Sequence, residues 1–201
     1  MIVLMRHART TGGRGRCIGR TPLPLSAAGV AQAQGLVQSL GPIDFKALYS
    51  SPSTRALETL APLASYLDFD VTVVPALDEI DMGQWEGRAF ETICEDDPVG
   101  YERRGRQFAT FRPPDGECFN DVADRALAAL AAFPVGPAPV LALTHAGVIR
   151  SILCRLTNHP MDDLFHFTPQ HTWCCVLGQT DAGLQVLAED LPPDRVHTLL
   201  D

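Results

Sequence analysis

The chain has 201 residues, of which 46% are hydrophobic and 20% are charged, and its net charge is −8. This composition is that of a globular domain and argues against intrinsic disorder. The acidic balance argues against nucleic acid as a partner, because phosphate backbones are bound by basic surfaces. No apolar run approaches the ~20 residues that cross a bilayer, so we expect no membrane partner and a cytoplasmic location.

The placement of cysteine and arginine is informative. The six cysteines show neither CxxC spacing nor another pattern of a zinc site or a disulfide framework, so we expect reduced thiols that pack in the core. No Asp or Glu precedes Asp44, whereas five arginines fall in that segment. Such an unbalanced cluster attracts small anions. Its members are Arg6, Arg9, Arg14, Arg16 and Arg20.

Apolar runs alternate with helical patterns over most of the chain. Short apolar runs predict buried strands, and apolar residues at helical spacing predict helices. Because strands are followed by helices, we expect a three-layer α/β/α fold with a mainly parallel central sheet. In chain order we expect a strand over 2–5, a helix from Ser26 to Gly41, a strand over 47–50, a helix after Ser53, a strand over 71–74, a helix after Asn120 or Asp121, a strand over 140–143, a helix over 146–157, and a late strand pair over 174–178 and 184–188.

The segment between the third strand and the late helices is irregular. From Pro75 to Pro114 it contains one expected short helix, around 88–94. Such a segment is typical of an insertion over one end of a fold. The chain shows no internal repeat or linker, so we expect one domain over residues 1–201 with an insertion or cap over about 75–118.

Two of the expected strands end in similar sequences. IVLMRHA places Arg6 and His7 after the first strand, and VLALTHAG places His145 after a later one. A lone histidine is more often structural than functional. Ligands of open α/β sheets bind outside the carboxyl ends of strands, however, so we expect these two histidines to face each other there.

An arginine occupies an unfavourable place at the start of the second expected helix. In SPSTRALET, Arg55 lies in the first turn, where the helix dipole disfavours a cation by ~0.3 to 1 kcal/mol. One interpretation is that Arg55 points to solvent or pairs with Glu58. The other is that an anion binds at the helix start, held by the arginine and the exposed amides together.

The stretch LDEIDMGQWEG supplies candidate acids, namely Asp78, Glu79 and Asp81. Loop carboxylates usually only face solvent. Beside an anionic substrate, however, a carboxylic acid keeps its proton near neutral pH and can donate it to a leaving oxygen.

Two arginines, two histidines and one acid together suit phosphoryl transfer. The transition state spreads charge over three oxygens, which guanidinium and imidazole donors stabilise. A neutral imidazole nitrogen is a good nucleophile for phosphorus when a hydrogen bond holds the other ring nitrogen. This chemistry requires neither a metal nor a cofactor, and we expect none.

The same motifs resemble those of the histidine phosphatase superfamily, also called phosphoglycerate mutase-like. LMRHART is similar to its Arg-His-Gly signature, and SPSTRALET, LDEIDMGQWEG and THAGVIR are similar to its three later elements, in family order. The resemblance implies a phosphoglycerate mutase-like fold and a phosphatase activity. It also implies roles: His7 is the nucleophile that becomes phosphorylated, Arg6 and Arg55 clamp the phosphoryl oxygens, His145 stabilises their charge, and Glu79 donates a proton and later takes one from water.

Two further stretches, RCIGRTPLPLSAAG and RPPDGECFNDVADRA, resemble the α-ribazole phosphatase branch of cobalamin synthesis. α-Ribazole 5′-phosphate is therefore the first expected substrate. The alternatives are a broad-specificity sugar or nucleotide phosphatase and a phosphoglycerate mutase-type enzyme, although the long mutase insertions are absent. Four residues depart from the branch pattern, namely Ile18, Pro22, Asp115 and Cys118.

Ala8 and Ala146 stand where the superfamily has glycine, and each adds a methyl group beside the expected phosphate pocket. These changes motivate a hypothesis of another class, an inactive relative that binds an anion and regulates a protein partner. A third hypothesis is that His7, His145 and Glu79 hold a metal ion.

The remaining expectations concern the partner, the oligomeric state and the other candidate residues. We expect a small-molecule phosphate as the partner and a monomer or a dimer as the oligomeric state. Arg150 is interpreted as structural, and four histidines without partner spacing receive no role: His159, His166, His171 and His197. The further residues expected to contact the substrate are Arg9, Thr10, Arg20, Ala146, Gly147 and Glu117.

Overall fold

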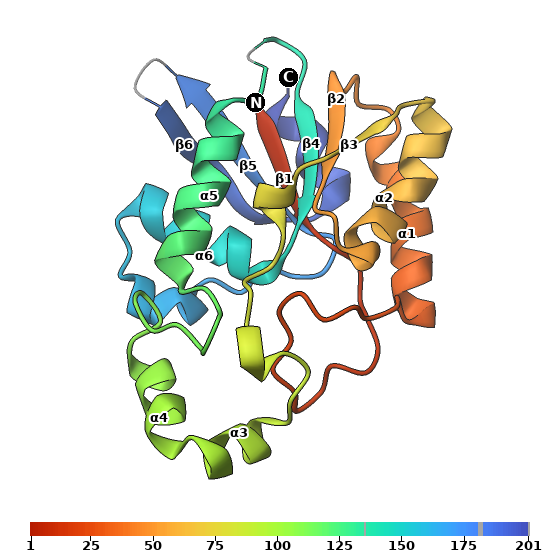
Figure 1. Ribbon diagram of the computed structural model, residues 1–201. Coiled ribbons are helices and arrows are strands. Elements are labelled where there is room, and N and C mark those ends of the chain that lie inside the picture. The colour runs from red at the N-terminus through yellow and green to blue at the C-terminus, as the bar shows by residue number, and fades with distance from the viewer. Residues whose placement is uncertain (135, 181–182, 201) are drawn as a thin grey trace.

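A six-stranded sheet forms the centre of the molecule in the computed structural model, which describes residues 1–134, 136–180 and 183–200 (Figure 1). The strand order is β3-β2-β4-β1-β5-β6. The first four strands pair in parallel, and β5 and β6 add an antiparallel edge. The strands are β1 (Ile2–Arg6), β2 (Ala47–Ser50), β3 (Val71–Val73), β4 (Val140–Thr144), β5 (Cys174–Thr180) and β6 (Gly183–Leu191).

Helices cover both faces of this sheet. In Figure 1, α1 (Ala27–Leu40) and α2 (Thr54–Leu67) lie to the right of the sheet, and α5 (Phe119–Ala131) and α6 (Ala146–Thr157) lie to the left. The strands serve both layers because successive side chains point to opposite faces. In β1, Val3 and Met5 pack in one core cluster, whereas Ile2 and Leu4 pack in the other. The expected three-layer α/β/α fold is confirmed.

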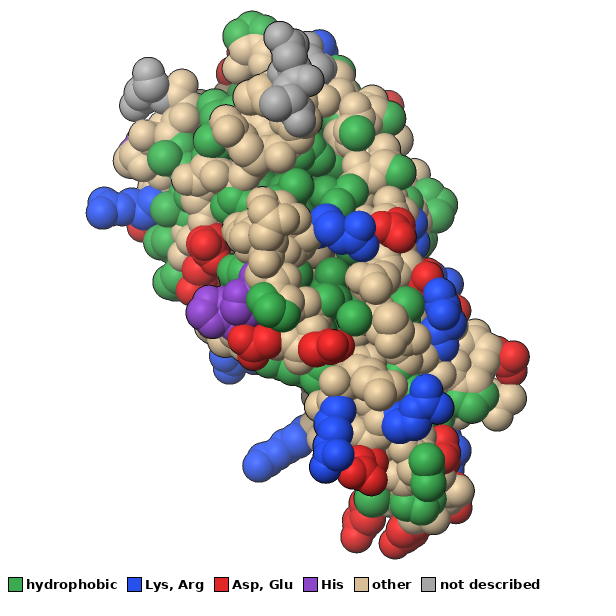
Figure 2. Space-filling model, turned by 90° about the vertical axis from the view of Figure 1, so that its left-hand side faces the viewer, with side chains coloured by type: hydrophobic (Ala, Val, Ile, Leu, Met, Phe, Trp, Pro, Cys, Tyr) green, Lys and Arg blue, Asp and Glu red, His purple; other side chains and the backbone are tan. Residues whose placement is uncertain are grey.

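The segment over 75–118 lies at the end of the molecule where β1 and β4 finish. It contains two short 3-10 helices, η1 (Pro75–Leu77) and η2 (Gly83–Trp85), followed by α3 (Phe90–Asp96) and α4 (Pro98–Arg106). In Figure 1, α3 and α4 lie below the sheet. Figure 2 shows many basic and acidic side chains on this end of the molecule. The sequence predicted only one helix here, because α4 is highly polar and has no apolar stripe.

One cap prediction agrees with the structure and another differs from it. Ser26 caps α1 as expected, since its hydroxyl accepts a hydrogen bond from the Gly29 amide at 3.1 Å. For α5, however, the N-cap is Cys118, and Asp121 lies inside the first turn and accepts from the Cys118 amide at 2.9 Å. Asp121 therefore stabilises the helix start from the third helical position rather than from the cap position.

Two more 3-10 helices, η3 (Met161–His166) and η4 (Pro193–Leu199), complete the fold. Among the described residues, no helix is long and apolar enough to span a membrane.

Candidate active site

The two motif histidines follow neighbouring parallel strands. β1 and β4 end in register at Arg6 and Thr144, and the His7 amide donates to the Thr144 carbonyl at 3.0 Å. The imidazole rings of His7 and His145 consequently face each other with their centroids 5.1 Å apart. The chain leaves β1 for a helix on one face of the sheet and leaves β4 for a helix on the other, which opens a crevice between the two strand ends.

His7 is held as a neutral imidazole with one free nitrogen. Its Nδ1 lies 2.7 Å from the Ala8 carbonyl, an acceptor only, so Nδ1 carries the hydrogen and Nε2 keeps its lone pair. Burial lowers the pKa of His7 far below its usual range, and the nearby His145 and Arg55 lower it further. The Ala8 methyl group is fully buried, and its amide donates to Thr59 Oγ1 at 2.9 Å. Alanine thus fits at this position.

His145 is fully buried and is the centre of a hydrogen-bonded chain. Arg55 Nε donates to its Nδ1 at 3.2 Å, so the hydrogen of the neutral ring resides on Nε2. That Nε2 lies 2.8 Å from Ser51 Oγ and 3.4 Å from Asp78 Oδ1. The Ser51 hydroxyl donates in turn to Asp78 Oδ1 at 2.9 Å. Burial lowers the pKa of His145, although Asp78 and Glu79 oppose this shift.

Asp78 is the charged end of this chain. Burial alone would raise the pKa of its carboxyl, but hydrogen bonds from His145, Ser51 and the Glu79 amide outweigh that effect and lower it to about 2. Asp78 therefore stays ionised and favours a proton on His145. The sequence identified Asp78 only as one of several loop carboxylates and gave Ser51 no role, although both lie within the quoted motifs.

Arg55 points into the protein, not to solvent. Only 3% of its surface is exposed, which contradicts the interpretation that it is solvated or paired with Glu58. Its two Nη groups donate to the carbonyls of Gly19 at 2.7 Å and Thr21 at 3.0 Å. These carbonyls and His145 compensate the unfavourable position of a cation at the start of α2. Burial lowers the pKa of Arg55.

Glu86 fixes the loop that supplies those carbonyls. Its carboxylate accepts from the amides of Gly19 at 3.2 Å, Arg20 at 2.7 Å and Thr21 at 3.0 Å, and from the Thr21 hydroxyl. Although burial alone would raise it, these bonds lower the pKa of Glu86. A Cβ at Gly19 would overlap the Ile80 carbonyl and Glu86, so the loop approaches closely enough only with glycine. Glu86 thereby positions Arg55.

Arg6 carries an unused donor. One Nη donates to the Pro169 carbonyl at 2.9 Å, while its buried Nε has no hydrogen-bond partner among the described residues. Burial lowers the pKa of Arg6 to about 10, so the group remains a cation at neutral pH. A buried, charged and unpaired donor is costly, and an anion that accepts from it removes the cost.

Glu79 lies buried next to the start of α6. Its two oxygens accept from the amides of Ile80 at 3.0 Å and Gly147 at 3.1 Å. A Cβ at Gly147 would overlap the Glu79 carboxylate, so glycine is required there. Gly147 therefore orients the acid, and its amide is already engaged. Ala146, the first residue of α6, is buried beside it.

The other residues expected to contact the substrate are partly committed to the fold. Arg20 donates to Asp81 at 3.0 Å and Glu117 at 3.2 Å, and Glu117 also pairs with Arg125 at 2.9 Å. These four side chains hold loops together. Arg9 and Thr10 follow His7 along the chain, where the Arg9 backbone bonds to Gln32 and Ser26. Their contact with substrate stays a prediction.

The sequence missed His171, which lies in the loop before β5. Its Nδ1 is 3.0 Å from the His7 carbonyl, and its ring centroid is 5.4 Å from that of His7. Burial lowers its pKa, as does the neighbouring Arg6. Because 164 residues separate the two histidines, no local spacing could have indicated this contact.

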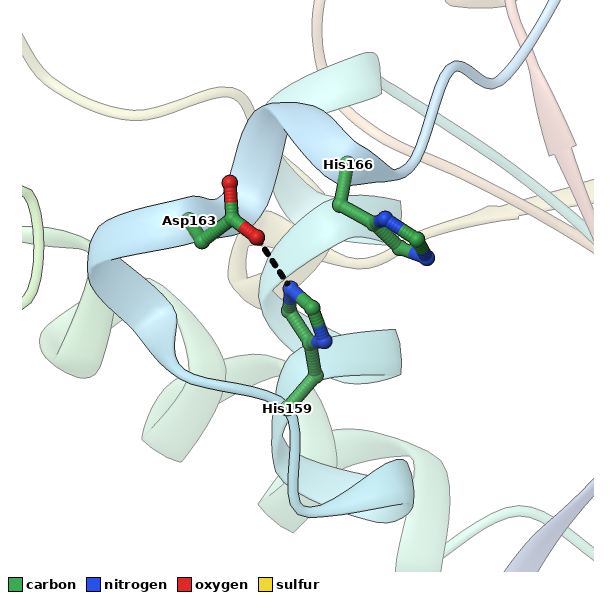
Figure 3. Close-up of side chains that lie close together, drawn as sticks. All are labelled: His159, Asp163 and His166. Atoms are coloured by element: carbon green, nitrogen blue, oxygen red, sulfur yellow. Dashed lines mark hydrogen bonds and ion pairs between the residues drawn. The ribbon is translucent and has the colours of Figure 1, made fainter.

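Two other histidines without a sequence signal come together on the surface (Figure 3). His159 Nε2 is 2.9 Å from Asp163 Oδ2, and the His159 and His166 rings stack with centroids 4.5 Å apart. Within the described ranges, His159, Asp163 and His166 form a group of three side chains that lie close enough together to hold a metal ion. His7, His145 and Glu79 do not form such a group, so the geometry gives no support to the metal hypothesis for the crevice.

The crevice combines a neutral imidazole, two buried guanidinium groups and a buried carboxyl group. His7 offers a free Nε2, Arg6 an unpaired Nε, and Arg55 and His145 lie directly beside them. Glu79 is positioned at one side. This arrangement suits a tetrahedral dianion whose phosphorus faces His7 and whose leaving oxygen faces Glu79.

Known proteins resemble this chain in sequence and in fold. A family model described as histidine phosphatase superfamily (branch 1) matches residues 2–190. An adenosylcobalamin/alpha-ribazole phosphatase of Escherichia coli K12 is 30% identical over 92% of this chain and 93% of its own length. A metal-independent phosphoserine phosphatase of Arabidopsis thaliana is 33% identical over 78% of this chain and 68% of its own. The solved structure of Bacillus stearothermophilus YhfR has a TM-score of 0.86 at 27% identity and covers 94% of this chain and 96% of its own.

Proposed function

The chain belongs to branch 1 of the histidine phosphatase superfamily and is a phosphatase, and from this premise we propose that it hydrolyses small phosphomonoesters through a phosphohistidine at His7, without a metal ion. The observation that carries the proposal is the His7 tautomer. Hydrogen bonding of Nδ1 to the Ala8 carbonyl leaves the Nε2 lone pair directed away from the backbone. Burial keeps that nitrogen unprotonated, so the nucleophile needs no base.

In the first step, His7 Nε2 attacks phosphorus while the bond from phosphorus to the ester oxygen breaks. Arg6 Nε binds a phosphoryl oxygen. Arg55 Nε exchanges its His145 partner for a second oxygen, which frees His145 Nδ1. That nitrogen takes up one proton from solvent as the dianionic ester binds, and it donates this hydrogen in a hydrogen bond to the same group. Protonated Glu79 gives its hydrogen to the leaving oxygen, so the alcohol departs neutral.

In the second step, water attacks the phosphohistidine. Glu79, now ionised, takes a proton from that water as its oxygen bonds to phosphorus, and the bond to His7 Nε2 breaks. Inorganic phosphate leaves, His145 returns its proton to solvent and accepts again from Arg55 Nε, and His7 and Glu79 regain their initial protonation states. The net reaction consumes one ester and one water and produces one alcohol and one phosphate.

α-Ribazole 5′-phosphate is the first substrate to test, because a relative over almost the whole chain is named an adenosylcobalamin/alpha-ribazole phosphatase. Phosphoserine is the second, from the name of the plant relative. A broad-specificity phosphatase would hydrolyse many esters at similar rates, whereas a mutase would transfer the phosphoryl group within a phosphoglycerate and release little phosphate.

A screen of purified protein against phosphorylated metabolites, run with EDTA and with a His7→Ala control, tests the proposal. We expect phosphate release that the chelator leaves unchanged and that His7→Ala abolishes. Release that stops in EDTA would favour metal chemistry in the crevice. No release from any ester by the native chain would favour the inactive anion-binding relative. The cytoplasmic location and the lack of nucleic-acid partners stay predictions.

A further inference from the structure

A cavity of about 390 Å³ lies between the crevice and the helices α3 and α4. Glu79 and Gly147, which belong to the crevice, also line this cavity. A phosphomonoester that directs its leaving oxygen at Glu79 therefore places the rest of its alcohol in the cavity. The volume lies within the usual range for small-molecule sites.

The walls of the cavity are largely apolar and aromatic. Met82 and Trp85 come from the region of η2, and Phe90 comes from α3. Phe108 follows the end of α4, and Phe165 lies in η3. Flat aromatic faces favour a flat apolar guest, because aromatic rings gain both from leaving water and from offset or edge-on contact with each other. A strongly hydrated sugar would lose hydrogen bonds in the same place.

Besides Glu79 and Arg150, the walls contain a third charged side chain, Arg104. Arg104 extends from α4, and its guanidinium carbon lies 4.4 Å from the Phe108 ring centroid and 4.9 Å from that of Phe119. Its Nη1 is buried and has no hydrogen-bond partner among the residues that the structure describes. Burial lowers the pKa of Arg104 to about 10, which leaves it charged at neutral pH.

Arg104 combines a buried donor with the lack of a partner within the described residues, whereas its neighbour Arg103 is exposed. Arg106, on the same helix, pairs with Glu102 at 3.0 Å, and Arg150 on the far wall donates its Nε to the Phe167 carbonyl at 2.9 Å. No ion pair of Arg104 occurs in the described ranges. A cation with an unpaired donor between two rings is unfavourable unless a guest supplies an acceptor.

We propose that this cavity selects phosphomonoesters of aromatic alcohols that carry a hydrogen-bond acceptor, a carboxylate being the strongest case, and that Arg104 binds this acceptor. The inference rests on the proposed function, because it assumes that the phosphoryl group lies against His7. Arg104 acts as a specificity-determining residue at the end of the substrate opposite to the reacting atoms.

The test measures kcat/KM from phosphate release for two pairs of esters. One pair is 3-carboxyphenyl phosphate and 3-tolyl phosphate, and the other is 4-carboxyphenyl phosphate and 4-tolyl phosphate. In each pair a methyl group replaces the carboxylate, and the ring and the reacting bond are otherwise alike. For the native chain we expect at least one carboxyphenyl ester to exceed its tolyl partner by about tenfold or more. Arg104→Met should bring that ratio close to one, and Arg104→Lys should give an intermediate ratio.

Arg103→Met is the matched control, because Arg103 is exposed on the same helix and its loss changes the net charge equally. It should preserve the native ratio. The inference would be overturned if, in the native chain, each carboxyphenyl ester had the same kcat/KM as its tolyl partner. It would also be overturned if Arg103→Met changed the ratio as much as Arg104→Met. If Arg104→Met fails to fold, a native ratio in Arg104→Lys would overturn it too. Failure of the native chain to hydrolyse any ester would instead overturn the proposed function.

Discussion

The crevice at the strand ends and the cavity between this crevice and the helices α3 and α4 share Glu79 but are built in opposite ways. In the crevice, most buried polar groups hold one another: Arg55 is bound by two carbonyls and by His145, and His145 by Ser51. Among the described residues, Arg6 Nε is the exception there. In the cavity, the walls are aromatic and the Arg104 Nη1 has no partner within the described residues.

This difference separates chemistry from selection. Groups that are rigidly positioned around the phosphoryl site stabilise the same transition state for every ester. Groups in the cavity touch only the alcohol. Changes in the crevice should therefore lower the rate for all substrates alike, whereas changes in the cavity should alter the ratio between substrates.

Arg55→Met is expected to have the largest effect. It removes the proposed phosphoryl ligand and leaves the Gly19 and Thr21 carbonyls and His145 without their donor. Removing one such preorganised donor costs a factor of about 100 to 1000 in kcat, and kcat/KM should fall equally for carboxyphenyl and tolyl esters. Arg14→Met, at an exposed arginine of the same basic segment, is the control. A fall confined to one ester class would break the separation.

Asp78→Asn should lower kcat by about tenfold, because an ionised Asp78 favours the protonated form of His145, and the proposed mechanism uses that form to stabilise the transition state. The pH profile of kcat distinguishes this role from simple loss of structure, since the limb that reports His145 should move to lower pH. The control is Asp81→Asn, which removes a neighbouring loop carboxylate that pairs with Arg20 and not with His145. A pH profile unchanged by Asp78→Asn would show that Asp78 does not act through His145.

Glu86→Gln should reduce kcat/KM by a smaller factor, about three to ten, because the amide keeps some of the hydrogen bonds to residues 19–21 but loses their charge-assisted strength. Both ester classes should be affected equally, since Glu86 acts through Arg55. Glu91→Gln, at an exposed position in α3, should change nothing. If Glu86→Gln altered only the ester ratio, the loop would belong to the cavity and not to the crevice.

Acid should weaken the fold through the crevice histidines. Burial lowers the pKa of His7 in the folded chain, whereas the unfolded chain takes up this proton near pH 6.5. The part of the free energy of unfolding that depends on neutral His7 is therefore fully present above pH 6.5. It declines as the pH falls below that value, by about 1.4 kcal/mol per pH unit for one histidine. Urea unfolding between pH 7.5 and 5 should show a shallower decline for His7→Asn. Parallel curves for the two proteins would contradict the buried neutral state.

Local sequence patterns predicted the crevice better than the cavity, for a physical reason. His7, Arg55 and His145 each follow a strand, and parallel strands bring their ends to one edge, so chain order and spacing imply their meeting. The partners that orient them do not repeat at any period: Ser51 and Asp78 are 27 residues apart.

The cavity depends on contacts that spacing does not encode. α4 is polar on most sides and shows no hydrophobic periodicity, so neither the helix nor the position of Arg104 was predicted. The alternative that placed Arg55 in solvent was wrong because it weighed the helix dipole alone, without the carbonyls that a distant loop supplies.

The most direct test of the account is to trap the phosphorylated enzyme. Glu79→Gln, mixed with 4-nitrophenyl phosphate, should react readily in the first step, because this leaving group needs no proton, and slowly in the second, because water has no base. Intact-mass measurement should then show one added phosphoryl group, and peptide mapping should place it on His7 in an acid-labile form. Turnover with no such adduct, or an adduct that persists in His7→Ala, would contradict the account.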